Sequence, residues 1–142
     1  MGSLPLISIV DDDASVRKSL CGLVRSVGFA AEAFASAKEF LSSGNVRDTH
    51  CLILDVRMPG MGGLELQRRL AADGCAVPVV FITAHGDAAS RAQALEAGAV
   101  ECLLKPFSEE ALLSAIRAGS GLPTTTSGNN ERQNFRTAPQ PG

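Results

Sequence analysis

The sequence predicts an α/β fold of the doubly wound type, with helices on both faces of a five-stranded parallel sheet. Two observations predict it. Short apolar runs alternate with helical patterns of apolar residues five times along the chain, which is typical of successive βα units. Four of the apolar runs also end in a chemically useful polar residue, and the carboxyl ends of parallel strands share one edge of such a sheet.

The first two βα units follow one another closely. An apolar run over 6–10 predicts the first strand, and apolar residues recur at helical spacing over 16–27 until Gly28 ends the helix. A weaker strand pattern covers 30–34. The sequence Ser-x-x-Glu beginning at Ser36 then fits a capping box and predicts the start of the second helix.

The remaining three units repeat this plan, with glycine or proline near their boundaries. Strands are expected over 52–55, 79–82 and 100–104. The expected helices are one that follows the glycine-rich turn 59–63 and carries Leu64, Leu66 and Leu70, an alanine-rich one capped by Asp87 and ended by Gly98, and one capped by Ser108.

Residues 120–142 differ in composition from residues 1–119. Within it, residues 123–142 are rich in Thr, Asn, Gln, Gly and Pro, and Phe135 is the only large apolar residue of those positions. Such a segment buries too little apolar surface to offset the entropy lost on ordering. We therefore expect one folded domain over 1–119, followed by a disordered tail or a linker over 120–142.

Composition excludes several classes of protein. A formal net charge of -2 and a pI near 5.6 give no electrostatic reason to bind nucleic acid or an anionic membrane directly. No run approaches the roughly 18 apolar residues of a membrane span, and the amino-terminal residues do not resemble a signal peptide. The four cysteines contain no C-x-x-C pair, so we expect reduced thiols and a cytoplasmic location.

Polar residues at the strand ends predict one site. Asp55 ends a strongly apolar strand, where an ionised carboxylate is costly unless a cation or a reaction requires it. Asp11 and Asp12 follow the first strand, and three close carboxylates call for a hard divalent cation such as Mg²⁺. Thr83 adds a hydroxyl and Lys105 an ammonium group. This set of groups suits transfer of a phosphoryl group onto Asp55 as the nucleophile.

These strand ends resemble those of the receiver domain of two-component response regulators, most closely the FixJ/NarL type. The resemblance covers roughly residues 5–119, and its matching segments are 9–13, 54–61, 82–86 and 104–107. It implies a flavodoxin-like (βα)5 fold with strand order 2-1-3-4-5. It also implies a protein that catalyses its own phosphorylation and dephosphorylation rather than acting as an enzyme on other substrates.

The resemblance assigns a role to each site residue. Asp55 would accept a phosphoryl group from a phosphohistidine of a sensor histidine kinase. Asp12, Asp55 and the backbone carbonyl of Arg57 would bind Mg²⁺, with Asp11 helping through a water molecule. Thr83 and Lys105 would hold the phosphoryl oxygens, and the peptide bond after Lys105 would be cis.

The resemblance also implies two docking surfaces. The kinase would meet the start of the first helix, together with the loop that follows the last strand; the residues concerned are Ser15, Val16, Ser19, Pro106 and Phe107. Output contacts, or a homodimer formed on phosphorylation, would use the fifth strand and the helices on either side of it. No direct contact with nucleic acid or membrane is expected of this domain.

The sequence departs from the family at Cys102. Three residues before the lysine, receivers usually carry Tyr or Phe, whose ring turns inward as the threonine moves. A thiol at this position leaves the phosphorylation chemistry intact but removes the ring that the usual switch employs.

Two alternative functions remain to be compared with the receiver. The pattern Asp11-x-Asp13-x-Ser15 loosely matches the nucleophile motif of haloacid-dehalogenase-type phosphatases. That class needs a further acidic motif after the lysine, and it leaves Asp55 unexplained. A pseudo-receiver, which only binds partners, would not need the complete set of acids, threonine and lysine.

Overall fold

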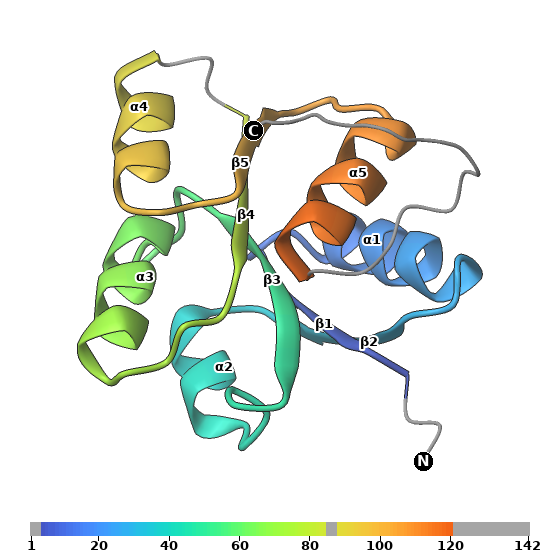
Figure 1. Ribbon diagram of the computed structural model, residues 1–142, viewed down its shortest axis with the longest axis horizontal. Coiled ribbons are helices and arrows are strands. Elements are labelled where there is room, and N and C mark those ends of the chain that lie inside the picture. The colour runs from blue at the N-terminus through green and yellow to red at the C-terminus, as the bar shows by residue number, and fades with distance from the viewer. Residues whose placement is uncertain (1–3, 85–87, 121–142) are drawn as a thin grey trace.

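The computed structural model describes residues 4–84 and 88–120, which form a central sheet between two layers of helices (Figure 1). All strand pairs are parallel, and the order is β2-β1-β3-β4-β5. The expected fold and strand order are therefore confirmed. The strands are β1 (Leu6–Val10), β2 (Ala30–Phe34), β3 (Thr49–Asp55), β4 (Val79–Thr83) and β5 (Glu101–Leu104).

Each strand is followed by one helix, as the alternating pattern predicts. Helices α1 and α5 cover one face of the sheet, and α2, α3 and α4 cover the other (Figure 1). The helices are α1 (Ala14–Ser26), α2 (Ala37–Ser42), α3 (Gly63–Ala72), α4 (Ala88–Glu96) and α5 (Glu109–Ser120). The predicted tail over 120–142 lies outside the described residues apart from Ser120, with which α5 ends, and so does the predicted cap Asp87.

Two apolar clusters fill the space between the sheet and its helices. Cys51 and Ile53 of β3 join the cluster under α1 and α5, whereas Leu52 and Leu54 join the cluster on the other face. All four side chains are fully buried. A central parallel strand is covered on both faces, which explains why its sequence is continuously apolar. This strand carries Asp55 at its end.

Strand β3 begins at Thr49, three residues before the expected start, because a buried polar pair extends it. The hydroxyl groups of Ser8 and Thr49 lie 2.7 Å apart, and the Thr49 hydroxyl donates to the backbone carbonyl of Asn45. These bonds satisfy a polar residue inside the sheet. In the sequence, the neighbours Thr49 and His50 are both polar, so they do not resemble the start of a buried strand.

The predicted helix caps are present wherever the structure describes them. The Ser36 hydroxyl accepts a hydrogen bond from the Glu39 N–H, and the Ser108 hydroxyl accepts one from the Ala111 N–H. In a standard capping box the Glu39 carboxylate would accept a hydrogen bond from the N–H of Ser36. Here it accepts one from the N–H of Ala35, one residue earlier in the chain. These bonds satisfy backbone donors that the helix cannot satisfy internally.

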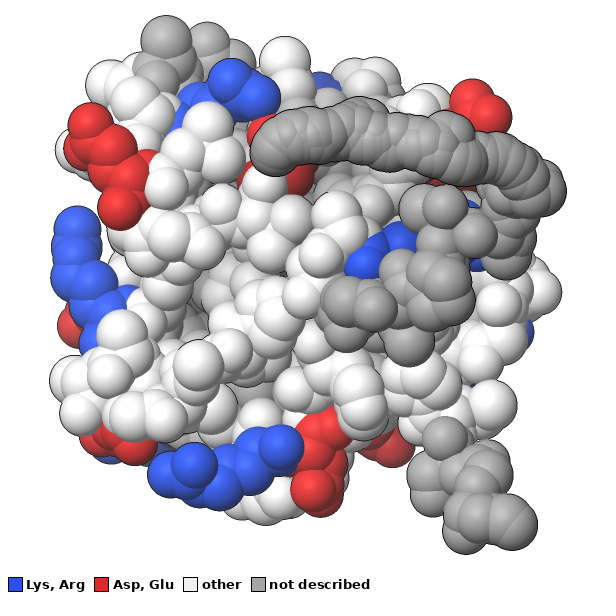
Figure 2. All heavy atoms as spheres, viewed as in Figure 1, with Lys and Arg blue, Asp and Glu red and all other residues white. Residues whose placement is uncertain are grey.

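The surface carries charges of both signs. In the view of Figure 2, acidic and basic side chains alternate around the rim, with uncharged residues between them. All four cysteines are free thiols, as expected. Among residues 4–84 and 88–120, no helix has the length and apolar character needed to cross a membrane.

Candidate functional site

Four strand ends bring the predicted site residues to one edge of the sheet. Asp11 follows β1, Asp55 ends β3, Thr83 ends β4 and Lys105 follows β5. Asp11, Asp55 and Thr83 are each at least 94% buried, with exposed fractions of 0%, 6% and 4%. Buried polar side chains at adjacent strand ends are unusual unless they have partners or a function.

Three carboxylates converge at this edge. One oxygen from each of Asp11, Asp12 and Asp55 lies within 4.8 Å of the other two. Burial, followed by the charge of Asp11, raises the pKa of Asp55 to about 6, although Lys105 acts in the opposite direction. The site is thus short of positive charge. Three hard oxygen donors, of which Asp12 is open to solvent, fit a divalent cation of the Mg²⁺ class.

Lys105 contacts the acids unequally. Its Nζ lies 2.9 Å from Asp11 Oδ2 and 3.9 Å from Asp55 Oδ2. Its backbone N–H donates to the carbonyl of Thr83 at 2.7 Å, which fixes the lysine beside the end of β4. The peptide bond between Lys105 and Pro106 is cis, as predicted. In this arrangement Lys105 is held mainly by Asp11.

The acidic residues in the turn between β1 and α1 have two different roles. Asp13 Oδ1 accepts the N–H of Ser15 at 2.8 Å and so caps α1. Asp11 Oδ1 accepts the N–H of Asp13 at 2.9 Å, and Asp11 Oδ2 faces Lys105. Arg17 Nη1 donates to the Asp11 carbonyl at 2.8 Å. Both carboxylate oxygens of Asp11 are thus engaged, which disfavours Asp11 as the nucleophile of a phosphatase.

The loop after β3 approaches the Asp55 backbone very closely. A Cβ atom on Gly63 would overlap the carbonyl oxygen of Asp55 and lie 3.0 Å from Phe81 Cε1. The Gly63 N–H donates to the Val56 carbonyl at 2.9 Å, and the Arg57 N–H donates to Asp55 Oδ1 at 3.3 Å. Only glycine allows α3 to begin so near the strand end.

The match to known proteins decides the family. The family model described as the response regulator receiver domain matches residues 7–117. The chain belongs to this family. It is a receiver domain of the kind found in two-component response regulators, as the motifs at the strand ends predict.

Curated relatives and solved structures agree with this assignment. The chain is 50% identical over 113 residues to the response regulator protein TodT of Pseudomonas putida, covering 80% of this chain and 50% of that protein. It is 45% identical over 115 residues to nodulation protein W of Bradyrhizobium diazoefficiens, covering 81% and 51% of the two chains. The chain thus spans about half the length of these curated relatives.

The structural likeness covers most of the chain. The response regulator StyR has 50% identity and a TM-score of 0.77, with 84% of this chain and 60% of that one covered. The structure titled FixJ-N has 36% identity and a TM-score of 0.75, with 86% and 98% covered.

A groove opens beside the acid pocket of this receiver domain. It has a volume of about 430 Å³ and lies between α1 and the segment that joins β5 to α5. Its lining includes every residue named from the sequence for kinase contact, together with Lys105 itself. The lining residues are Ser15, Val16, Ser19, Leu20, Leu23, Lys105, Pro106, Phe107 and Glu109.

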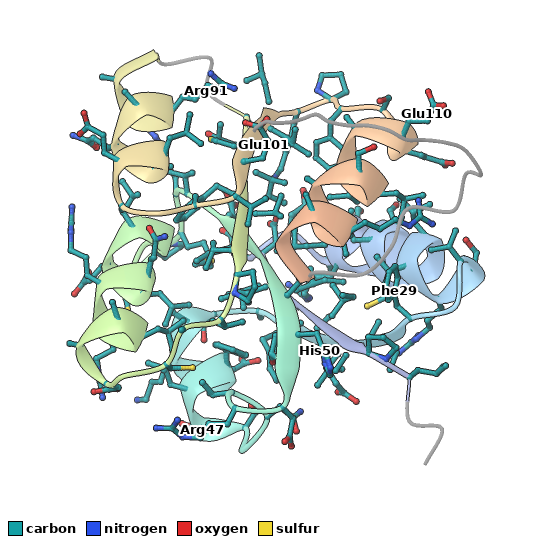
Figure 3. The ribbon with its side chains drawn as sticks, in the orientation of Figure 1. Phe29, Arg47, His50, Arg91, Glu101 and Glu110 are labelled. Atoms are coloured by element: carbon teal, nitrogen blue, oxygen red, sulfur yellow. The ribbon has the colours of Figure 1, made fainter. Side chains whose placement is uncertain are left out.

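The α4–β5 face of this receiver carries Cys102 at the position where its resemblance to receivers leads us to expect an aromatic residue. Cys102 is 5% exposed, and burial raises the pKa of its thiol. Arg91 of α4 and Glu101 of β5 face one another (Figure 3) and form an ion pair of 2.9 Å. The Glu101 carboxylate also accepts the Cys102 N–H, and Arg91 Nε donates to the Cys102 carbonyl at 3.4 Å.

Sequence reasoning missed Arg17, Gly63 and the Arg91–Glu101 pair. Gly63 carried a weak signal, since a glycine opened the helix after a glycine-rich turn. The two arginines carried none, because an arginine on a helix usually lies in solvent.

Proposed function

We propose that this receiver domain accepts a phosphoryl group on Asp55 from a phosphohistidine of a sensor histidine kinase. The observation that supports this most is the convergence of Asp55, Asp11 and Asp12 within 4.8 Å, with Lys105 Nζ 3.9 Å from Asp55. An acid at the end of a buried strand is thereby surrounded by the groups that phosphoryl transfer requires.

The reaction is a displacement at phosphorus. A carboxylate oxygen of Asp55 attacks the phosphorus atom, the P–N bond breaks, and its electron pair stays on the imidazole nitrogen. A pKa of about 6 leaves Asp55 mostly ionised near neutral pH, so the nucleophile is available. Lys105 and the Thr83 hydroxyl then bind the oxygens of the transferred group.

Dephosphorylation restores the starting state. Water attacks the phosphorus of the aspartyl phosphate, the bond from phosphorus to the Asp55 oxygen breaks, and inorganic phosphate leaves. The domain thus acts on its own side chain, and its output is the change of partner contacts between the two states.

Mg²⁺ is the cofactor that the donor set fits. Asp12, Asp55 and the backbone carbonyl of Arg57 would hold the ion, with Asp11 acting through a water molecule. When bound, Mg²⁺ supplies positive charge to the phosphoryl oxygens. Burial and, after it, the charge of Asp11 raise the pKa of Asp55, which supports this role because a bound cation would stabilise the ionised carboxylate against both effects.

The proposed partners are a sensor histidine kinase and either an output partner or a second copy of the chain. The apolar groove beside Lys105 would receive the kinase, since a helix laid there brings its phosphohistidine near Asp55. The α4–β5–α5 surface would carry output or homodimer contacts, and a cytoplasmic location would suit such a partner. These assignments rest on the family and on the position of the groove.

Labelling with a small phosphodonor tests the proposal. Acetyl phosphate and Mg²⁺ should add one phosphoryl group to the wild-type chain, as measured by intact mass spectrometry. Asp55→Asn should abolish the labelling, and Lys105→Ala should shorten retention of the group. Asp48→Asn is the matched control, because Asp48 is exposed just before β3 begins, at the opposite end of that strand. Undiminished labelling of Asp55→Asn would refute the assignment.

A further inference from the structure

We propose that Arg17 is a positioning residue for the metal-binding turn between β1 and α1. Its guanidinium group fixes the peptide that joins Asp11 to Asp12, and through that peptide it places the Asp12 carboxylate. This inference rests on the proposed function, because it concerns the Mg²⁺ site formed by Asp11, Asp12 and Asp55.

Every polar group of Asp11, in its backbone and in its side chain, has a partner. Its N–H donates to the Phe34 carbonyl at 3.2 Å, and its carbonyl accepts from Arg17 Nη1 at 2.8 Å. Its carboxylate engages the Asp13 N–H and Lys105. Asp11 itself is 0% exposed. Of these four attachments, the bond from Arg17 is the one that acts on the peptide leading to Asp12.

Asp12 depends on that peptide because its own surroundings restrain it little. Its side chain is exposed, so packing does not fix its direction. The orientation of the Asp11 carbonyl sets the plane of the peptide between the two acids. If the carbonyl loses its donor, it turns toward water and the Asp12 carboxylate moves away from Asp55. The three carboxylates together then bind a small cation less tightly.

The charge of Arg17 acts in the opposite direction. A guanidinium group bonded to the backbone of the acid-bearing turn repels a divalent cation, so removing it would strengthen Mg²⁺ binding if charge alone mattered. Arg17 is only partly buried, and solvent and salt screen such a long-range effect. The short hydrogen bond to a buried residue is screened far less. We therefore expect the loss of the hydrogen bond to outweigh the loss of repulsion, so that Mg²⁺ binding becomes weaker when Arg17 is replaced. If repulsion dominated, Mg²⁺ binding would become stronger.

Helix α1 offers a matched control in Arg25. Arg25 lies eight positions after Arg17 on the same helix, and its Nη2 donates to the backbone carbonyl of Ala31 in β2 at 3.0 Å. Both arginines thus tie α1 to the sheet through one guanidinium–carbonyl bond. Only Arg17 reaches the turn that carries the acids. A general loosening of α1 would affect both variants alike.

Magnesium titration of the full 142-residue chain tests the inference. We would measure the Mg²⁺ dissociation constant by calorimetry, and by the NMR shifts of the amides of 11–13, in the absence of phosphodonor. Arg17→Met should raise this constant about tenfold, in the range of a lost outer-sphere partner. Arg25→Met should change it by less than about twofold. Arg17→Lys, which keeps a donor, should fall between wild type and Arg17→Met.

A second readout separates placement from chemistry. With acetyl phosphate at saturating Mg²⁺, Arg17→Met should be labelled on Asp55 to nearly the wild-type extent, because no reacting group is lost. Circular dichroism would verify folding, and Arg17→Lys provides the test if Arg17→Met does not fold.

Three outcomes would overturn the inference. Unchanged or tighter Mg²⁺ binding by Arg17→Met would show that the hydrogen bond does not place Asp12. Equal weakening in Arg25→Met would show a merely structural role. Absence of Mg²⁺ binding by the wild-type chain would remove the metal site from the proposed function as well, whereas the first two outcomes leave that function standing.

Discussion

The acid pocket around Asp55 and the α4–β5 face are built by different kinds of interaction. In the pocket, the buried carboxylate of Asp11 is held by a backbone N–H and by Lys105 at 2.9 Å. On the α4–β5 face, the Arg91–Glu101 pair has side chains that are 56% and 36% exposed. Buried polar groups lose much when a partner is removed, whereas exposed pairs lose little.

Under the proposed function, this difference separates the chemistry of the pocket from the signalling of the face. The pocket tolerates little change, because each group there fixes another. The α4–β5 face can change its exposed Arg91–Glu101 pair at small cost in stability, and Cys102 lies buried beneath that pair. The pocket should therefore show large mutational effects and the face small ones.

Gly63→Ala should give the largest effect and would test how rigid the pocket is. The added Cβ overlaps the Asp55 carbonyl oxygen and meets Phe81 at 3.0 Å, so the strand end or α3 must shift. We expect a loss of about 1–3 kcal/mol in the free energy of unfolding, measured with urea, and slower labelling by acetyl phosphate.

Gly22→Ala is its control. Within the described part of the chain, no atom lies within 4 Å of a Cβ at Gly22, which is exposed in the middle of α1. This variant should gain about 0.5–1 kcal/mol, since alanine favours a helix more than glycine does. If Gly63→Ala were as stable as Gly22→Ala, the pocket would be more adaptable than we infer.

Asp55→Asn should stabilise the metal-free domain at neutral pH. Burial raises the pKa of Asp55 from 3.8 to about 6, so the folded state favours the protonated carboxyl group. That favourable contribution is complete below about pH 3.8 and is lost as the pH rises through about 6. At about pH 7.5, removing the charge should therefore add about 1–2 kcal/mol to the free energy of unfolding.

The pH and Mg²⁺ dependences check the cause of this gain. Well below about pH 3.8 the two proteins should unfold with similar free energies, because the carboxyl group is then protonated in both the folded and the unfolded state. Mg²⁺ should stabilise the wild type more than Asp55→Asn, since only the wild type keeps all three carboxylates. A gain that is constant from acid to neutral pH would contradict a charge-based explanation.

The sequence predicted the pocket well because its information is local. Asp11, Asp55, Thr83 and Lys105 each follow an apolar run, and parallel strands must deliver their ends to one edge. The hydrogen bonds and ion pairs of individual arginine side chains were not predictable in the same way. The bond from Arg17 to the Asp11 carbonyl requires the rotamer of a long side chain. The Arg91–Glu101 pair joins two different elements across ten positions.

Ser19→Glu should separate the groove from the pocket. Ser19 lines the groove next to Lys105, so a charge there should slow transfer from a cognate kinase about tenfold while acetyl phosphate labels Asp55 normally. Ser26→Glu places the same charge at the exposed end of the same helix, at a residue that does not line the groove, and should change neither rate. Equal kinase rates for the two variants would count against docking in the groove.

The smallest effect is expected at Cys102. A conformational switch can be biased only by contacts that differ between its two states. A turning aromatic ring changes a large buried area, whereas a thiol is small and a weak donor. Cys102 is already buried, with an exposed fraction of 5%. Its N–H donates to the Glu101 carboxylate, and its carbonyl accepts from Arg91. Its side chain therefore has little to exchange between the two states.

Nuclear magnetic resonance with beryllofluoride, a mimic of the phosphoryl group, tests this expectation. Thr83, Ala84 and the first turn of α4 should show the largest amide shifts, and Cys102 small ones; the rest of the expected moving segment, 85–87, lies outside the described residues. Arg91→Ala should cost less than about 0.5 kcal/mol in stability, as exposed pairs do, yet it should enlarge the shift at Cys102 by freeing its carbonyl. Large shifts centred on Cys102 in the wild type, with Ala84 and α4 unmoved, would show that the face switches through the thiol after all.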